Sequence, residues 1–308
     1  FSEEERLAAL PLVVWAGQTR TGDITENTAF DTTRGGSLWA KVCSDSGFCR
    51  SQRCRTNGRC FAGNIRKAAQ RSHIVVVNHA LLFADIASEN AILGEYEHLI
   101  LDEAHNVEKI AAHYLGRELT MWRVKNLTDQ LRSTGFTSTG TLPALRHWIS
   151  VAKVDDATAK AFDAGISSAT GEADELWERT QTFFQALTDR AAEAAGGRTQ
   201  SYIEKLRYKP EEPAFDSLQT EIADLAEVIT GLGERLESLA GWLRNLPADS
   251  FPGQDDFRGE MEGRIEECAS LMSDLGYLTR PEDDRSVYWM ELPGRENSID
   301  TRLMAVPL

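Results

Sequence analysis

The sequence has no long apolar run, few cysteines and fewer basic than acidic residues. No stretch approaches the roughly 18 apolar residues that a membrane span needs, which excludes a transmembrane protein. Five cysteines in 308 residues are few for a secreted disulfide scaffold. With 33 Lys and Arg against 48 Asp and Glu, the formal net charge is -15, which argues against a surface that is basic overall. Any nucleic-acid contact must therefore be local.

What remains is the composition of a soluble protein, with 42% apolar and 26% charged residues and enough length for about two domains. The chain begins at Phe1 without an initiator Met and without a charged and then apolar leader. We expect it to be a piece of a longer protein from a reducing compartment, the cytoplasm.

Four of the five cysteines lie within eighteen positions, at Cys43, Cys49, Cys54 and Cys60. Such clustering in a leaderless acidic chain indicates metal ligation. The spacing of five, four and five residues lacks the close pairs of common zinc fingers and suits a 4Fe-4S cluster. Structural zinc and unligated thiols remain alternatives, because four thiolates also suit tetrahedral zinc. Cys268 stands in a helical context and is expected to be a buried thiol.

A basic segment surrounds these cysteines, with seven basic and no acidic residues between positions 49 and 71, so the rest of the chain sums to -22. This contrast predicts a contact surface for a phosphate backbone. The alternative is a solvated face that balances an anionic cluster. The candidate DNA-binding residues are Arg50, Arg53, Arg55, Arg59, Arg66 and Lys67, followed by Arg71.

Two short β-branched runs, residues 74–77 and 98–101, predict buried strands of a parallel sheet, joined through a helix at 80–85. The second run ends at Asp102 and Glu103. At a strand end, Asp102 would hold Mg²⁺ through water and Glu103 would polarise the water that attacks a γ-phosphate. The alternative is a helix N-terminus that carries acids.

A phosphate loop should accompany such acids, and residues 17–24 have two glycines at the required spacing. Asp23 replaces the lysine that faces the phosphates, so we reject this segment as a nucleotide loop. We expect the true loop to lie before Phe1.

From about residue 106 to 276 the pattern is that of amphipathic helices, and we predict a compact bundle inserted into the sheet. Strand chemistry returns at 287–292 and 299–305, where we expect the sheet to resume. One helical stripe consists of Leu218, Ile222, Leu225, Ile229, Leu232, Leu236, Leu239 and Leu243.

These features occur in a fixed order: cysteines, a helix, the stretch 74–82 with Asn78-His79, the motif Asp-Glu-Ala-His at 102–105, and then long helices. In this order the chain resembles the iron-sulfur helicases of superfamily 2, the DinG/XPD family, and its bacterial DinG branch in particular. Cys49, Cys54 and Cys60 match the last three cluster ligands of that branch. Residues 15–23, with Thr-Arg-Thr-Gly-Asp, also resemble the stretch that precedes them.

The resemblance implies an α/β fold with a large all-α insertion: a partial RecA-like parallel sheet, an iron-sulfur cluster domain and a helical Arch domain. The intact relative would unwind DNA in the 5' to 3' direction with ATP and Mg²⁺, and His105 would join Asp102 and Glu103 in its catalytic motif. The implied domains are 1–72 (cluster domain and flanks), 73–105 (partial motor domain 1 with the DEAH box), 106–280 (Arch) and 281–308 (return strands of motor domain 1).

In the family the first cluster ligand commonly lies further upstream, so Cys43 is either its substitute or an incidental neighbour. The leading hypothesis is a helicase fragment that forms a gate for single-stranded DNA and lacks ATPase activity without the rest of the polypeptide. A protein partner could bind the Arch. The alternative is a non-enzymatic, zinc-stabilised module that binds nucleic acid or docks a partner. Metal identity distinguishes the two hypotheses.

Overall fold

The computed structural model of the protein describes residues 3–31, 35, 38–39, 42–44, 60–88, 90, 92–132, 140–152, 154–194, 204–209, 215–248, 250–251, 253–292 and 301–307. The chain divides into two compact units, Phe1–Asp102 and Glu103–Leu308. The division falls inside the Asp-Glu-Ala-His motif, three residues before the start that the sequence predicted for the helical domain.

The first unit contains short helices. A small apolar core of Leu12, Phe30 and Leu38 contacts Trp15 and Trp39, and the two indole rings meet edge to face with centroids 6.3 Å apart. The predicted first helix ends before Pro11, as expected, but a second helix begins at once with Pro11 in its first turn, where proline is tolerated. The helices are α1 (Glu3–Ala8), α2 (Leu10–Ala16), the 3-10 helix η1 (Ile24–Glu26), α5 (Phe61–Ala69) and α6 (His79–Ala87).

Helices α5 and α6 confirm two helices that the sequence predicted, and each starts at a side-chain cap. The Cys60 sulfur accepts a hydrogen bond from the Gly63 N–H at 3.4 Å, and the Asn78 side chain accepts one from the Leu81 N–H at 2.8 Å. Each cap satisfies a backbone donor that the first helical turn leaves without a partner.

The two predicted parallel strands are not found as strands. Residues 74–77 and 98–101 have no regular secondary structure and pair with no strand among the described residues. Ile74, Val76 and Ile100 are 83, 92 and 94% exposed. A buried parallel strand needs hydrogen-bonded neighbours and helices over its faces, and the described part of the chain provides neither for these segments. The described residues therefore contain no RecA-like parallel sheet.

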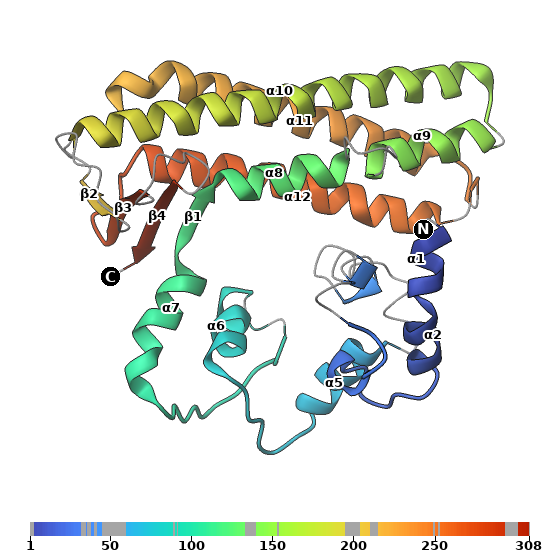
Figure 1. Ribbon diagram of the computed structural model, residues 1–308, viewed down its shortest axis with the longest axis horizontal. Helices are drawn as coiled ribbons and strands as arrows, with labels where there is room; N and C mark the ends of the chain where they lie inside the picture. Colours follow the sequence, from blue (N-terminus) through green and yellow to red (C-terminus); the bar gives the residue numbers. More distant parts are fainter. Residues whose placement is uncertain are drawn as a thin grey trace. The chain divides into compact units, whose positions relative to one another are not determined.

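The second unit is a helical bundle with a small sheet. Its helices are η2 (Ala104–Asn106), α7 (Val107–Leu115), α8 (Met121–Leu131), α9 (Thr141–Val151), α10 (Asp156–Ala194), η3 (Asp216–Leu218), α11 (Gln219–Asn245) and α12 (Gln254–Thr279). Its strands are β1 (Arg117–Thr120), β2 (Glu204–Tyr208), β3 (Ser286–Leu292) and β4 (Arg302–Pro307). Within this unit α10 and α11 form an outer layer, and α8 with α12 forms the layer next to the sheet (Figure 1).

The apolar stripe that the sequence predicted is the buried face of α11. Its members from Ile222 to Leu243 are all buried, and they face α10 and α12. The 39 residues of α10 make a helix about 58 Å long. Helices α11, α8 and α9 pack against it. The prediction of a compact bundle rather than a long coiled coil is thus confirmed for the described helices.

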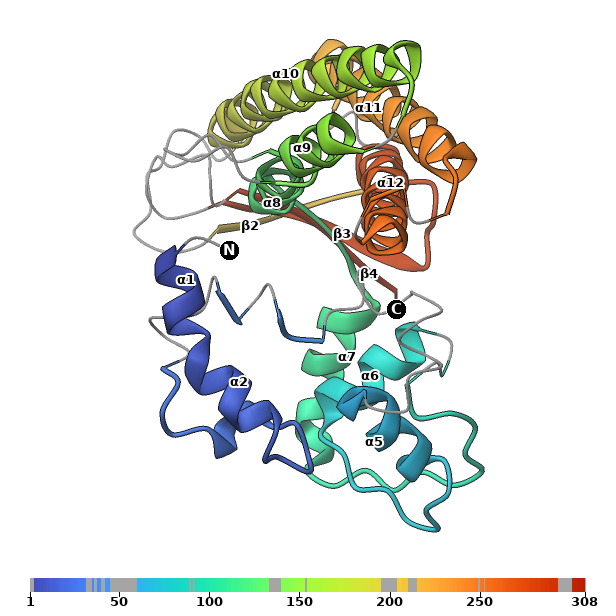
Figure 2. The same cartoon turned by 90° about the vertical axis from the view of Figure 1, so that its right-hand side faces the viewer.

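The four strands form one antiparallel sheet in the order β1-β4-β3-β2. Figure 2 shows this sheet below α8 and α12. Strands β3 and β4 were expected to rejoin the parallel sheet of the motor domain, but their partners are β1 and β2 of the helical unit. In β3 buried and half-buried residues alternate, because one face of the strand packs on the helices. The short β1 was not predicted from the sequence.

Cys268 confirms the expectation of a structural thiol. It is 2% exposed within α12, and burial raises the pKa of its thiol to about 12, so the group stays protonated at neutral pH. Among the described helices, none combines the length and the apolar character that crossing a bilayer requires.

Candidate functional site

Asp102 and Glu103, which the sequence predicted at the end of a strand, lie in an exposed turn. Asp102 and Glu103 follow the irregular segment 98–101, and η2 and then α7 begin directly after them. The Glu103 carboxylate lies 3.3 Å from the His105 imidazole, Oε2 to Nδ1, with both side chains well exposed. Asp102 and Glu103 are therefore accessible to a nucleotide, a metal ion or another part of a protein.

Glu103 has an unusual backbone. Its φ and ψ of 49° and 45° are left-handed, a conformation that costs a residue with a Cβ about 1–2 kcal/mol. Only Asn90 and Glu103 among the described non-glycine residues have a positive φ. Such strain is concentrated at functional sites, so the observation supports a functional turn rather than an ordinary helix start. The sequence motif had marked this residue, but not its backbone.

Of the four clustered cysteines, the structure describes Cys43 and Cys60; Cys49 and Cys54 lie outside the described residues. Cys43 and Cys60 are both half-buried. No group of three or more metal-binding side chains occurs in the described ranges, where only two of the four candidate ligands are present. The sulfur of Cys60 already accepts an N–H hydrogen bond, a contact of the kind that tunes iron–sulfur clusters, so this residue fits a thiolate-ligated group.

The basic segment is described only in its second half. Arg66 and Lys67 are exposed in the last turn of α5, and Arg71 is exposed just beyond it. Arg50, Arg53, Arg55 and Arg59 lie outside the described residues. The described part thus presents its cations to solvent, where they are able to contact a phosphate backbone.

The rejected phosphate-loop candidate forms a closed turn at residues 19–26. Its Gly22 and Asp23 N–H groups donate to the hydroxyl oxygens of Thr19 and Thr21 at 3.0 Å, and the Thr25 N–H donates to Asp23 Oδ1 at 2.9 Å. The last bond, with the Thr25 hydroxyl, lowers the pKa of Asp23. These backbone donors are used within the turn, whereas a phosphate loop directs them at its ligand.

One buried carboxylate was missed by sequence reasoning. Asp85 of α6 is fully buried, and its Oδ1 accepts the N–H groups of Ile92 and Leu93 at 2.8 and 2.9 Å. It therefore fixes the segment that leads from α6 toward residues 98–101. The signal available in the sequence was that Asp85 is the only acid in an otherwise apolar helix.

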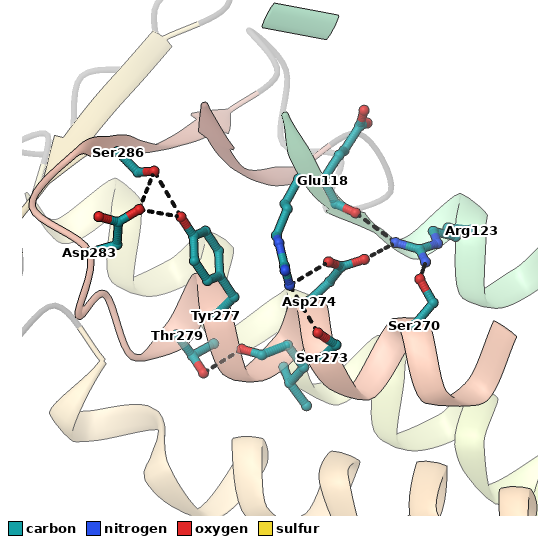
Figure 3. A network of polar contacts seen from close by, with 11 residues as sticks. Glu118, Arg123, Ser270, Ser273, Asp274, Tyr277, Thr279, Asp283 and Ser286 are labelled. Carbon is teal, nitrogen blue, oxygen red and sulfur yellow. Dashed lines mark hydrogen bonds and ion pairs between the residues drawn. The ribbon is translucent and has the colours of Figure 1, made fainter. Parts of the chain in front are cut away.

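A cavity of about 610 Å³ opens in the second unit, and none of residues 102–105 is part of its lining. Its lining includes Trp122, Arg117, Glu118 and Asp129. The charged side chains of this lining are all paired. Arg123 bonds Asp274, as Figure 3 shows, and also Glu267, and Arg117 bonds Asp274 as well. Glu118 pairs with Arg302, and Asp129 pairs with Lys125. With mixed charge and few free donors, this cavity does not have the character of a nucleotide site.

Comparison with known proteins identifies the relatives of the chain. ATP-dependent DNA helicase YoaA of Haemophilus influenzae is 34% identical over 121 residues, which are 38% of this chain and 19% of that protein. ATP-dependent helicase DinG of Mycobacterium tuberculosis is 34% identical over 110 residues, 35% of this chain and 16% of that protein. The 3'-5' exonuclease DinG of Bacillus subtilis is 23% identical over 312 aligned positions, 98% of this chain and 31% of that protein. No protein-family model matches the chain.

The chain is therefore homologous to DinG and YoaA proteins, two of these three being named as ATP-dependent helicases and one as an exonuclease. This similarity supports the DinG-type helicase that the sequence motifs indicated, and the iron-sulfur part of that expectation stays a prediction. The chain spans between about a sixth and a third of the length of these relatives.

Proposed function

We propose that the chain is a piece of an ATP-dependent 5' to 3' DNA helicase that contains an iron-sulfur cluster domain, part of the first motor domain and a helical Arch domain. The observation that carries the proposal is the similarity to DinG and YoaA proteins named as ATP-dependent helicases, of which the chain spans only a part. The second unit, with its layered helices, is the proposed Arch. The remainder of the polypeptide would supply the phosphate loop and the second motor domain.

In this proposal Asp102 holds Mg²⁺ through water and Glu103 polarises the attacking water, with His105 beside Glu103. Both carboxylates are exposed in the described residues, as is required of groups that must meet ATP and a second domain. The chain by itself is expected to have no ATPase activity. The neighbouring cluster and Arch domains would form a gate for one DNA strand.

Cys43, Cys49, Cys54 and Cys60 would hold a 4Fe-4S cluster. When bound, the cluster supplies a rigid crosslink between the loops that carry its ligands. The chain's own contribution is the thiolates and the helix α5, whose first turn already bonds the Cys60 sulfur. The basic segment, with Arg50, Arg53, Arg55, Arg59, Arg66 and Lys67, would contact single-stranded DNA.

Metal analysis of anaerobically purified protein tests this proposal. We expect a brown protein that contains iron and acid-labile sulfide, and a Ser replacement of Cys49, Cys54 or Cys60 should remove the colour. Cys268→Ala is the control and should keep the iron, because that thiol is buried in α12. One zinc per chain, or full colour in all three Ser variants, contradicts the cluster. The Cys43→Ser variant shows whether that residue is the fourth ligand.

A further inference from the structure

The turn at residues 19–26, which the proposed function leaves without a role, contacts the helix that begins after Cys60. Gly22 has a φ of +75°, and a Cβ at this position would lie 2.4 Å from Cγ and 2.5 Å from Cβ of Phe61. Real Cβ atoms do not approach other carbons so closely, so only glycine fits here. The backbone of the turn therefore lies directly against the Phe61 side chain.

The turn is held in shape by its own side chains. The Glu26 carboxylate accepts hydrogen bonds from the hydroxyls of Thr19 at 2.8 Å and Thr21 at 2.6 Å. The Thr19 oxygen in turn accepts the Gly22 N–H at 3.0 Å. Because one carboxylate joins both ends of the turn, Gly22 has little freedom to move away from Phe61.

Phe61 is adjacent to Cys60 in the chain and is the first residue of α5. The Cys60 sulfur is bonded to the Gly63 N–H in the same helical turn. The Phe61 Cβ is fixed to the backbone, so a Cβ at position 22 would be accommodated only if the start of α5 moved, and Cys60 would move with it. The contact from Gly22 reaches a candidate ligand through a single peptide bond.

We propose that the 19–26 turn is a positioning element for the metal site: Gly22 fixes Phe61, and Phe61 fixes the orientation of Cys60. This inference rests on the proposed function, because it assumes that Cys60 is a cluster ligand. Gly22, Glu26 and Phe61 act here as positioning residues.

The test compares iron retention in variants of the 308-residue chain, purified anaerobically. Gly22→Ala places a Cβ against Phe61. Gly94→Ala is the matched control, because Gly94 also has a positive φ, +85°, in the same unit, but its added Cβ would meet only the flexible Gln70 side chain at 3.3 Å. The two variants share the backbone strain and differ in the contact with Phe61.

We expect the Gly22→Ala chain to lose iron to a ferrous chelator about tenfold faster than the unmutated chain, and Gly94→Ala to stay within about twofold. The electron paramagnetic resonance signal of the reduced cluster should change in Gly22→Ala alone. Adding Phe61→Gly removes both the ring and the Cβ that the Ala side chain at position 22 would meet, so the double variant should lose iron no faster than Phe61→Gly by itself. Such a rescue would not follow from a general loss of stability.

Glu26→Ala provides a second variant, because it removes the carboxylate that holds both threonines without crowding Phe61. We expect severalfold faster iron loss, with the circular dichroism of the helices unchanged. If the unmutated chain holds iron and both Gly22→Ala and Glu26→Ala retain it like the Gly94→Ala control, the positioning role is wrong while the cluster stands. An unmutated chain without iron and sulfide overturns the proposed cluster itself.

Discussion

Two residues in or near the candidate motif, Glu103 and Asp85, are held in energetically costly arrangements. Glu103 has a left-handed backbone conformation. The fully buried carboxylate of Asp85 accepts hydrogen bonds from the N–H groups of Ile92 and Leu93. Neither arrangement is what an unconstrained surface loop would adopt, because both carry a free-energy cost that the surrounding structure must offset. The backbone is therefore held in a particular conformation at Glu103 and at Ile92 and Leu93.

The role of Glu103 is tested in the full-length helicase. Glu103→Gln keeps the size and backbone of the residue but removes the charge that polarises water, so we expect kcat for ATP hydrolysis to fall at least about a hundredfold with nucleotide binding largely unchanged. Glu108→Gln, an exposed acid in the first turn of α7, is the matched control and should retain activity. Near-normal turnover of Glu103→Gln would remove this glutamate from the mechanism.

At the scale of elements, a polar network joins α12 to the strand β1 and to helix α8 (Figure 3). Asp274 of α12 bonds Arg123 at 2.5 Å and Arg117 at 3.4 Å, and the Arg117 guanidinium also stacks over the Tyr277 ring at 4.4 Å. Burial lowers the pKa of Arg123, but its hydrogen bonds to Asp274 and Glu267 outweigh this effect and raise the pKa. The network fixes the sheet to the bundle.

Removing the shared carboxylate tests that connection. Asp274→Ala leaves two arginines without their common partner, one of them largely buried, and should lower the free energy of unfolding by about 2–3 kcal/mol. Asp129→Ala deletes the exposed partner of Lys125 and should cost no more than about 0.5 kcal/mol. Urea unfolding followed by far-UV circular dichroism measures both. Equal losses in the two variants would mean that the network adds little beyond surface charge.

At the scale of the whole molecule, charge is unevenly distributed along the chain. The segment 49–71 carries seven positive charges while all other residues sum to -22. An acidic bundle repels a phosphate backbone, so DNA binding should depend on the basic segment and on salt concentration.

This charge distribution predicts the behaviour of Arg53→Glu/Arg59→Glu. Each lost phosphate contact lowers the slope of log affinity against log salt for a single strand by about 0.7, so the double variant should reduce the slope by more than about one unit and weaken binding to all sequences alike. Arg280→Glu/Arg285→Glu makes the same change in net charge on exposed residues of the second unit and should leave the slope nearly unchanged. Equal slopes in the two variants, with iron content intact, would show that the strand runs elsewhere.

Local pattern was sufficient for much of the helical structure. The stripe from Ile222 to Leu243 predicted α11, and the helices α5 and α6 were also predicted correctly. A helix forms its hydrogen bonds between residues that are only four positions apart, and the spacing of its apolar residues indicates which face is buried. The order of motifs was likewise enough to indicate the DinG-type family. The cluster, the DEAH box and the DNA contacts stay predictions.

Strand pairing could not be determined in this way. The runs at 74–77 and 98–101 and the segments of β3 and β4 were all predicted as strands from local pattern. The first two pair with no strand in the described residues, whereas β3 pairs with β2 and β4, and β4 pairs with β1. A strand is completed by hydrogen bonds to residues far away in the chain, so its partner is decided by the tertiary structure. The same holds for the contact of Gly22 with Phe61: the sequence determined which residues are there, and only the fold brought positions 22 and 61 together.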